Sequence, residues 1–591
     1  MASDEKTFTT VEHQADFCVV GGGMAGVCAA LAAARHGART VLIHDRPVLG
    51  GNASSECRVH VCGADRHLTF PHLQESGLVL EMRLANLAAN PNREYPLWDL
   101  VLYDLCRQEP NLTVLLNCSV QTAEADDRQV QSVTGWQVTT EQWHRVSAGI
   151  FADCSGDGVL APLVGAPYRI GREAREEFGE SIAPEQADSK TMGMTILFQA
   201  RKHETPQPYT TPAWVRRFDS CDELPEPGDH RKHWQMGYWW VELGGQDESI
   251  TPTEDLRDRL LAVALGVWDH IKNRCEHTRE SAANWALCWV QMLPAKRESR
   301  RYIGAHVLNQ NDIEAGGPFH DVVAYGGWSM DDHHPAGFEA VRLGVPATVY
   351  HHAPSPYGIP YRCLRSAEIE NLMFAGRCHS ATHAALSSTR VMATGAVMGQ
   401  AVGTAAAIAT REGLMPADVD SRIQELQQTL LADDCFLPAV PRKAGRLTAS
   451  ARIEATCNAE QAEAVRDGIN RPLGADTHAW AHGCGDTIAL LFDRPEEVGR
   501  VNLLLDSDFD RDLQMSYHRV SKTPWQVPPT LVKRFGIEGL RGGQWQVLVE
   551  EDANVQRHVV VPVKGAWEGI RFVPRETHGA DRCRLYGFYV D

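Results

Sequence analysis

The fold is decided by one stretch near the N-terminus, VVGGGMAGVCAALAAARHGARTVLIHDRPVLGGNASSE, which spans residues 19–56. A short apolar run at 16–20 precedes three glycines, and a run rich in alanine and leucine follows them and ends at Gly37. A second apolar run, residues 39–45, comes next. This order predicts a strand, a tight turn, a helix closed by a glycine and a second strand, which together form one right-handed βαβ unit of a parallel sheet.

The three glycines Gly21, Gly23 and Gly26 follow the pattern GxGxxG. The first permits a tight turn, the second lets the backbone approach a pyrophosphate, and the third lets helix and strand pack closely. The start of the helix would offer amide donors and a partial positive charge to phosphates. Asp45 closes the second strand, where it is placed to accept hydrogen bonds from ribose hydroxyls. A packing turn without a ligand is the alternative, which the strand–turn–helix context disfavours.

Further stretches extend this pattern into a family resemblance. The pair of glycines in RPVLGGNASSE resembles the loop of glutathione-reductase-like flavoproteins that passes the flavin pyrophosphate. DCSGDGVLAPLVGA at 153–166 looks like their second nucleotide motif, and 371–406 looks like their C-terminal flavin motif. With YGIPYRCL (357–364) and RESRRYIG (297–304), the chain resembles the FAD-dependent oxidoreductase family that carries GGNxSSE, over most of residues 16–410. The resemblance implies bound FAD.

The resemblance also implies which residues hold the cofactor. Thr389, Arg390, Thr394 and Gly395 would start a helix whose N-terminus faces the flavin pyrimidine and stabilises negative charge there. Asp45 departs from the commoner Glu but is chemically adequate. The full set of expected cofactor-binding residues is Gly21, Gly23, Gly26, Asp45, Arg46, Gly50, Gly51, Asn52, Ser54, Val120, Asp153, Gly156, Asp157, Gly376, Arg377, Thr389, Arg390, Thr394 and Gly395.

Composition limits the remaining classes of function. The 591 residues are too many for one core, and a net charge of -19 repels phosphate backbones, so we expect no nucleic-acid partner. The N-terminus has no apolar signal core. The small-residue run 393–410 is better explained by a buried helix than by a membrane span. Sixteen scattered cysteines without a CxxC pair favour reduced thiols in the cytoplasm and no metal site.

The chain divides into several parts. We expect an α/β fold: a Rossmann-like FAD-binding domain (1–165 and 366–432), a β-meander over 111–150, and an inserted α+β substrate domain (166–365). After a proline-rich linker, alternating apolar runs at 445–591 predict an all-β jelly-roll sandwich, which resembles discoidin-like, galactose-binding-like modules. Such modules bind sugars or serve only as docking domains.

Histidines are the candidate bases, because their pKa lies near working pH. His333 and His334 follow an acidic pair, and His379 and His383 follow the C-terminal flavin motif, four residues apart as on one helix face. A structural role is the alternative for each of them. We place His334, backed by a neighbouring carboxylate, opposite His379 across the flavin.

Other residues are candidates for binding the substrate. Arg300 and Arg362 could bind an anion, with salt bridging as the alternative. Tyr238 and Trp239 could line a sugar-stacking cleft or belong to a domain core. A covalent flavin link through Cys57 is disfavoured, because nothing local argues for a thiolate.

The expected function is therefore that of an FAD-dependent oxidoreductase. It would move a hydride from a C–H bond of a polar, carbohydrate-like small molecule, a sugar or glycoside, to the flavin, with a histidine base. Reduction of an activated double bond is one alternative, and a carbohydrate-binding protein with a structural FAD is another. We expect no membrane partner, and a homo-oligomer is compatible with the sequence.

Overall fold

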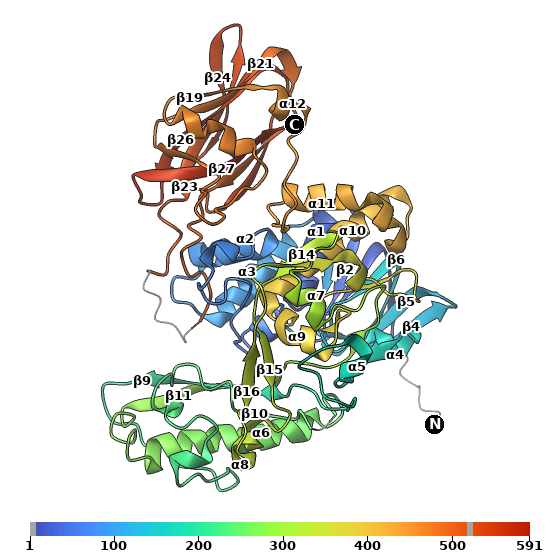
Figure 1. Cartoon of the computed structure of the whole chain (residues 1–591), viewed down its shortest axis with the longest axis vertical. Helices are drawn as coiled ribbons and strands as arrows, with labels where there is room; N and C mark the ends of the chain where they lie inside the picture. The colour runs from blue at the N-terminus through green and yellow to red at the C-terminus, as the bar shows by residue number, and fades with distance from the viewer. Residues whose placement is uncertain (1–7, 247, 517–523) are drawn as a thin grey trace, which may run out of the picture. The chain divides into compact units, whose positions relative to one another are not determined.

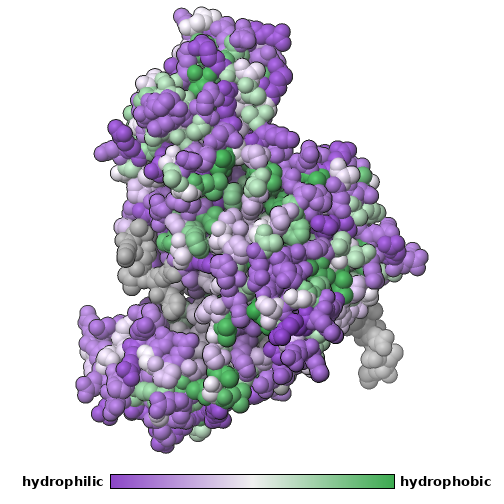
Figure 2. Space-filling view, viewed as in Figure 1, coloured by the Kyte–Doolittle hydropathy of each residue, from purple (hydrophilic) through white to green (hydrophobic). Residues whose placement is uncertain are grey.

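The computed structural model describes residues 8–246, 248–516 and 524–591. It divides into two compact units, the first built mainly from residues 1–63 and 98–421 and the second from 64–97, 422–513 and 521–591. Hydrophilic residues cover most of the face drawn in Figure 2, as the net charge of -19 leads one to expect. All sixteen cysteines are free thiols.

The first unit contains the predicted βαβ unit. Strand β1 (Thr10–Val20) pairs in parallel with β2 (Thr40–Ile43), and helix α1 (Met24–Arg35) connects them. The sheet has the order β3-β2-β1-β6-β5-β4, and β18 (Leu372–Phe374) joins it in parallel beside β6 (Gln142–Asp153). The C-terminal part of the sequence motif therefore returns to the sheet that holds the N-terminal part. Strands β2 and β6 of this sheet are labelled in Figure 1.

The expected meander is only partly correct. Strands β4 (Cys118–Asp126), β5 (Gln129–Gln137) and β6 pair antiparallel in sequence, as predicted. The first part of the region instead forms a separate strand, β3 (Leu112–Leu115), which pairs in parallel with β2. The chain breaks between β3 and β4 at Asn117, whose φ of 54° is unsuited to a continuous strand.

The small-residue run forms helix α10 (Met392–Glu412). By length and composition it could cross a membrane, but 94% of its apolar window is buried inside the structure. Helix α10 packs so closely on α1 that no side chain fits between their backbones at two positions. A Cβ at Gly399 would lie 2.0 Å from the Ala25 carbonyl oxygen, and a Cβ at Gly403 would lie 2.0 Å from the Ala29 carbonyl oxygen. The small residues therefore serve helix–helix packing, as the buried-helix interpretation predicted.

The inserted region carries its own core. Helix α6 (Thr253–Asp269) and strands β8 (Met194–Thr195), β9 (Phe198–Lys202) and β11 (Trp285–Val290) surround it. Trp234, Tyr238, Trp240 and Trp268 are buried in this core. A two-stranded sheet of β15 (Met330–His333) and β16 (Thr348–His351) follows, and β14 (Val322–Gly326) pairs with β17 (Tyr357–Pro360).

The second unit contains the predicted sandwich. Its two antiparallel sheets have the orders β19-β21-β26-β23-β24 and β20-β27-β22-β25. Apolar residues from both sheets, such as Ile570 of β26 (Ala566–Thr577) and Leu503 of β22 (Arg500–Leu505), form one core. The remaining strands are β19 (Arg452–Ala455), β20 (Trp480–Gly483), β21 (Ile488–Glu497), β23 (Val532–Arg541), β24 (Gln544–Glu551), β25 (His558–Pro562) and β27 (Arg582–Val590).

The predicted domain boundaries need two corrections. The prediction places residues 64–97 and 422–432 in the FAD-binding domain, but both segments group with the second unit. Leu80, Leu84 and Leu87 of α2 (Leu78–Ala89) pack with Leu513 in a small apolar cluster. Buried Arg471 donates hydrogen bonds to the His72 and Gln74 carbonyls. No local pattern in 64–97 reveals these distant partners.

Candidate active site

The glycine turn has the shape that a dinucleotide requires. Gly21 has a φ of 105°, and a Cβ there would lie 2.4 Å from the Ser155 amide nitrogen. At Gly26 a Cβ would lie 1.8 Å from the Gly21 carbonyl oxygen. At Gly23, by contrast, a Cβ would meet nothing within 4 Å. Two glycines are thus required by packing, whereas the third borders open space at the N-terminus of α1.

His44 holds this turn in place through hydrogen bonds, and it is not among the predicted cofactor-binding residues. The Gly22 amide donates a hydrogen bond to His44 Nδ1 at 3.0 Å, and Nε2–H donates to the Val48 carbonyl at 3.1 Å. Burial lowers the pKa of His44, so the ring stays neutral and can accept from the amide. The only sequence signal was a polar residue at the end of an apolar strand.

The second glycine pair lies beside the first turn. The Gly50 amide donates to the Gly22 carbonyl at 2.8 Å, and a Cβ at Gly51 would lie 3.1 Å from the Gly23 Cα. Asn52 donates to the Lys296 carbonyl at 3.2 Å, and Ser54 is buried. The structure therefore brings the first two predicted motifs together.

The two predicted charged residues of this loop differ in availability. Asp45 lies past the end of β2 with its side chain 60% exposed, and its Oδ1 lies 3.3 Å from His44 Nδ1. Arg46 forms a two-point ion pair with Glu56, at 2.6 and 3.0 Å. Val120 lies in β4 with its side chain in the core of the sheet.

The second nucleotide motif is fixed by one buried acid, Asp153, and one partly exposed acid, Asp157. Asp153 accepts hydrogen bonds from the Ser155 and Leu160 amides and from the Tyr302 hydroxyl, at 2.7–2.9 Å. Its carboxylate therefore holds the loop in place. Asp157 pairs with Lys296 at 2.8 Å and with Arg377 at 3.3 Å. Burial alone would raise the pKa of Asp157, but these two cations lower it overall.

The third motif meets the first two. A Cβ at Gly156 would lie 2.7 Å from Arg377 Nη2, and one at Gly376 would lie 3.1 Å from the Ala25 Cβ. Gly395, in the first turn of α10, would place a Cβ 3.4 Å from the Gly376 Cα. The stretches that the sequence singled out therefore converge around the start of α1.

The expected start of the C-terminal helix is shifted. Thr389 is the last residue of α9 (His383–Thr389), and its hydroxyl donates to the Ala385 carbonyl. Arg390 caps that helix and donates to Asp331, at 3.1 and 3.2 Å. The helix α10 begins at Met392 and holds Thr394 in its first turn. The break at Arg390 and Val391 divides what the sequence suggested as one helix start.

These residues fit FAD. The α1 N-terminus faces the open space at Gly23, and Asp45 is exposed near it. Within the described ranges, the buried Arg377 Nη1 and Thr394 Oγ1 have no hydrogen-bond partner. A cofactor with phosphates and a polar ring would supply acceptors and donors for such atoms.

Of the predicted histidines, His379 has the geometry of a neutral base. It is fully buried, and its Nδ1–H donates to the Gly376 carbonyl at 2.7 Å. Its Nε2 has no partner within residues 8–246, 248–516 and 524–591. Burial lowers the pKa of His379 to about 4, against the opposing effect of the Gly376 carbonyl. A lone pair is therefore available at Nε2 at neutral pH.

The predicted pairing of His379 and His383 on one helix face is wrong. Thr382 caps α9 by accepting a hydrogen bond from the Ala385 amide, so the helix begins at His383 and His379 lies in the loop before it. The short helical turn of residues 376–378 ends at His379.

His333 and His383 are each held between two carboxylates. His383 lies 2.8 Å from Glu298 Oε2 through Nδ1 and 3.2 Å from Asp332 Oδ1 through Nε2. His333 lies 2.6 Å from Glu242 Oε2 and 3.3 Å from Asp331 Oδ1. Both nitrogens of each ring therefore lie within 3.3 Å of a carboxylate oxygen.

Cations complete this carboxylate–histidine network. Buried Arg301 donates to Glu298 and, at 2.8 Å, to Glu173, and Arg297 lies 3.3 Å from Glu242. Burial would raise the pKa of Glu242, but Arg297 and then His333 outweigh it and lower the pKa. Every buried charge in this network thus has an opposite charge beside it.

His334 differs from the prediction. Its expected partner Asp332 pairs with His383 instead, and the Ala336 amide donates to His334 Nδ1 at 3.2 Å. Burial and then Arg172 lower the pKa of His334, and the opposing effect of Asp332 is smaller. Because Nδ1 accepts, the other ring nitrogen of the neutral side chain carries the proton.

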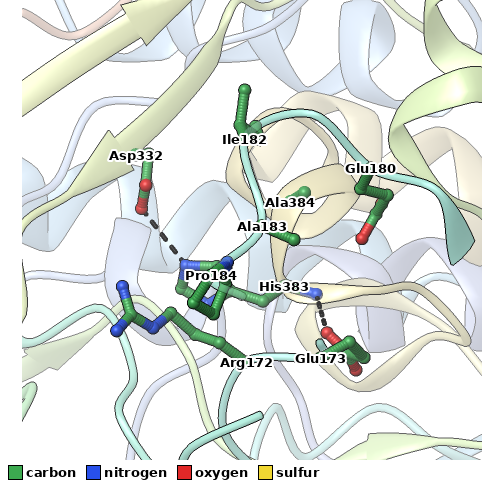
Figure 3. Close-up of a pocket in the computed structure, with 9 residues that line it drawn as sticks. All are labelled: Arg172, Glu173, Glu180, Ile182, Ala183, Pro184, Asp332, His383 and Ala384. Carbon is green, nitrogen blue, oxygen red and sulfur yellow. Dashed lines mark hydrogen bonds and ion pairs between the residues drawn. The ribbon is translucent and has the colours of Figure 1, made fainter. Parts of the chain in front are cut away.

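A small polar pocket lies beside the network, and Figure 3 shows His383 within it, joined to Asp332 and through its backbone amide to Glu173. Buried Glu180 Oε1 accepts from Thr382 Oγ1 at 2.6 Å, while Oε2 has no partner in the described part of the chain. Burial raises the pKa of Glu180. The pocket is lined by Arg172, Glu173, Glu180, Ile182, Ala183, Pro184, Asp332, His383 and Ala384.

The predicted substrate-binding residues are dispersed. Arg362 forms an ion pair with Asp321, at 3.0 and 3.2 Å, and Arg300 donates to the Asp157 carbonyl. Tyr238 is buried in the core of the inserted region, where its hydroxyl donates to the His230 carbonyl. Trp239 is partly exposed and makes an edge contact with His60, with 5.6 Å between ring centroids. Salt bridging therefore accounts for Arg362 and core packing for Tyr238, whereas Arg300 makes no ion pair among the described residues and its Nε has no hydrogen-bond partner there.

The covalent link that the sequence disfavoured also finds no support in the geometry. Cys57 is buried, and its thiol donates to the Leu293 carbonyl. Burial, with a smaller contribution from Glu56, raises the pKa of Cys57 to about 12. A thiol of this kind is a poor nucleophile at neutral pH.

A family model described as FAD dependent oxidoreductase matches residues 16–430. No curated protein matches the chain.

Solved structures are similar to separate parts of the chain. A p-nitrophenol 4-monooxygenase from Pseudomonas putida is 13% identical, covering 72% of this chain and 86% of its own, at a TM-score of 0.30. A geranylgeranyl bacteriochlorophyll reductase-like protein from Thermoplasma acidophilum is 11% identical with the same coverage and TM-score. The family 32 carbohydrate-binding module of Streptococcus pneumoniae EndoD is 13% identical over 24% of this chain and 97% of its own, at a TM-score of 0.20.

Proposed function

The chain belongs to the FAD-dependent oxidoreductase family, and we propose that it oxidises a C–H bond of a polar, hydroxyl-bearing small molecule with His379 as the base. The bound FAD supplies the hydride acceptor. The observation that carries the proposal is the unshared lone pair of a buried, neutral His379, fixed by its bond to Gly376.

Elimination among the four candidate histidines supports this choice. His333 and His383 direct both ring nitrogens at carboxylates, and His334 accepts a backbone amide on Nδ1. His379 alone of the four keeps an unused acceptor nitrogen. A proton from a substrate hydroxyl would pass to this nitrogen as the C–H bond is broken.

The pocket beside His383 has room for about one water-sized group, so it would take a single hydroxyl of a substrate and not a whole sugar ring. Glu180 Oε2 is a buried acceptor that needs a donor, and Asp332 and Glu173 add carboxylates on the same pocket. Hydroxyls donate to such groups, as would those of a sugar or a glycoside. The carbohydrate class is part of the proposal.

Reduction of an activated double bond is the second candidate. Such substrates are commonly anionic and need cations that are not already paired. Arg301 is paired with Glu173 and Glu298, and Arg172 with Asp188 at 2.5 Å. These two cations beside the pocket are already engaged, which supports a neutral polyhydroxyl substrate there.

The test is an anaerobic screen of sugars, polyols and glycosides, read as loss of the oxidised flavin absorbance. We expect at least one compound to bleach the flavin. Glu180→Gln should raise the KM for that compound while FAD remains bound, and exposed Glu176→Gln serves as the matched control. If only external reductants bleach the flavin, and an unsaturated acceptor then reoxidises it, the result would favour the reductase. No redox response at all, with sugar binding retained, would favour a carbohydrate-binding protein with structural FAD.

A further inference from the structure

Four potential metal ligands meet in the inserted region, away from the residues assigned to FAD. They are Cys221, His230, His270 and Cys275, whose ligand atoms all lie within 4.8 Å of one another. His230, His270 and Cys275 are buried, and Cys221 is partly exposed. The set combines two thiols with two imidazoles.

Three segments bring these side chains together. Cys221 opens a short helical turn, Cys221–Glu223, and His230 lies in another, Asp229–Arg231. A π-helical turn, His270–Arg274, follows α6; His270 is its first residue and Cys275 comes directly after it. In this turn the Cys275 amide donates to the His270 carbonyl at 2.7 Å, which places two residues five apart at one point. Such π-helical turns are rare in proteins, and those that occur often lie at functional sites.

The distances match a tetrahedron around zinc. Bond lengths of about 2.3 Å for Zn–S and about 2.0–2.1 Å for Zn–N give edges of about 3.8 Å between sulfurs and about 3.5 Å between sulfur and nitrogen. The Cys221 and Cys275 sulfurs lie 3.7 Å apart. Cys221 Sγ lies 3.5 Å from Nε2 of both His230 and His270, and Cys275 Sγ lies 3.4 Å from His230 Nε2.

The His270 imidazole is oriented with its free lone pair toward the sulfurs. His270 Nδ1–H donates to the Phe218 carbonyl at 3.1 Å, which leaves the lone pair on Nε2, the atom that faces the sulfurs. A hydrogen bond on the far ring nitrogen is the usual partner of a metal-bound histidine. His230 Nε2 lies 3.5 Å from Cys221 Sγ and 3.4 Å from Cys275 Sγ, and its Nδ1 has no hydrogen-bond partner among the described residues.

We propose that Cys221, His230, His270 and Cys275 bind one zinc ion as a closed structural site. Two thiolates neutralise the charge of Zn²⁺, and four protein ligands leave no position for a substrate. The site ties residues 221–230 to the end of α6 beside Phe218, Leu224 and Ile271 of the buried core. Binding deprotonates both thiols and releases the protons to solvent.

Zinc content of the purified holoprotein, measured by plasma mass spectrometry, tests the proposal. We expect close to one zinc per chain in the wild type and loss of it in the double variant Cys221→Ser/Cys275→Ser. Cys288→Ser, which changes an exposed thiol of the same region, is the matched control and should retain the metal. FAD content reports whether each variant has folded.

A second measurement needs no variant. Cobalt exchanged into the wild-type protein should give the intense absorption of a thiolate–cobalt bond and the visible bands of a tetrahedral ion. A mercurial reagent that blocks thiols should release the zinc. The proposal is overturned if the wild type carries no zinc and binds none, if it carries iron, or if thiol titration finds Cys221 and Cys275 joined as a disulfide.

Discussion

The cofactor cradle and the carboxylate–histidine network lie in the same unit but are built in opposite ways. The cradle is made of backbone: glycines whose missing side chains let β1, α1, the Gly50–Gly51 loop and the Gly376 loop touch. The network is made of charged side chains on β15, α9 and the segments near Glu173, Glu242 and Glu298. The first depends on shape and the second on pairing of buried charge.

The difference predicts different failures on mutation. An added methyl group in the cradle collides with backbone that cannot move, or it occupies the space of the cofactor. Loss of one charge in the network leaves its partner buried and unpaired. The cradle should therefore fail in folding or in FAD binding, and the network should fail in stability and in pH response.

Two glycines of the cradle should separate folding from binding. At Gly26 a Cβ lies 1.8 Å from the Gly21 carbonyl, so Gly26→Ala should prevent folding of the first unit, whereas Gly23→Val has room in the protein and should fold but lose FAD. Flavin absorbance and thermal unfolding of each variant measure this. Gly149→Ala, with its nearest atom at 3.5 Å, is the control. Equal FAD content in Gly23→Val and the wild type would break the assignment of the cradle.

A single charge removed from the network should cost several kcal/mol. Glu298 is fully buried and accepts from Arg301, His383 and the Met192 amide. Glu298→Gln removes one of the two carboxylates that balance the buried charge of Arg301. This substitution should lower the free energy of unfolding by about 3–5 kcal/mol. Chemical denaturation of the FAD-bound form measures the loss.

The matched control lies on the surface. Glu254 is 76% exposed in its pair with Arg257, and Glu254→Gln should change stability by less than about 1 kcal/mol. If both substitutions have the same small effect, the network is not a set of interdependent buried charges.

The smallest effect is expected at a histidine without flanking carboxylates. In the sandwich His482 is buried and stacks on Trp480, and burial lowers the pKa of His482 to about 4. Its folded pKa lies below the unfolded value of about 6.5, so its contribution is complete above that value and is lost as pH falls toward 4. Between pH 7 and 5 the second unit should lose about 2 kcal/mol.

The control is the variant His482→Gln, in which the second unit should not lose this stability between pH 7 and 5. The unfolding transition of the sandwich, followed at both pH values in the wild type and in the variant, gives the difference. An equal pH dependence in both proteins would assign the effect to other groups.

The cradle and the sandwich strands could be predicted because their signals are local. Gly21, Gly23 and Gly26 lie within six residues, and the apolar alternation of β21 or β27 is contained in one strand. Residues 64–97 were misassigned because their partners, such as Arg471, are distant in sequence.

The network and the four potential zinc ligands had no local signal. Glu298 and His383 are separated by 85 residues, and Cys221 and Cys275 by 54. His334 is predicted as a base because Asp332 precedes it by only two residues, but β15 ends at His333, so His334 lies outside the strand that carries Asp332. Only the fold decides that Asp332 contacts His383 instead.

The central claim is that His379 is a neutral base, and the rate of flavin reduction measured by stopped flow under anaerobic conditions tests it directly. With a substrate from the screen, the wild-type rate should show no acid limb between pH 6 and 9, because the pKa of His379 is lowered to about 4. His379→Gln should retain FAD and reduce it about 10²–10⁴-fold more slowly, while His320→Ala, whose ring is 74% exposed, should reduce it at the wild-type rate. A His379→Gln protein that holds FAD and reduces it as fast as the wild type across this pH range would contradict the account.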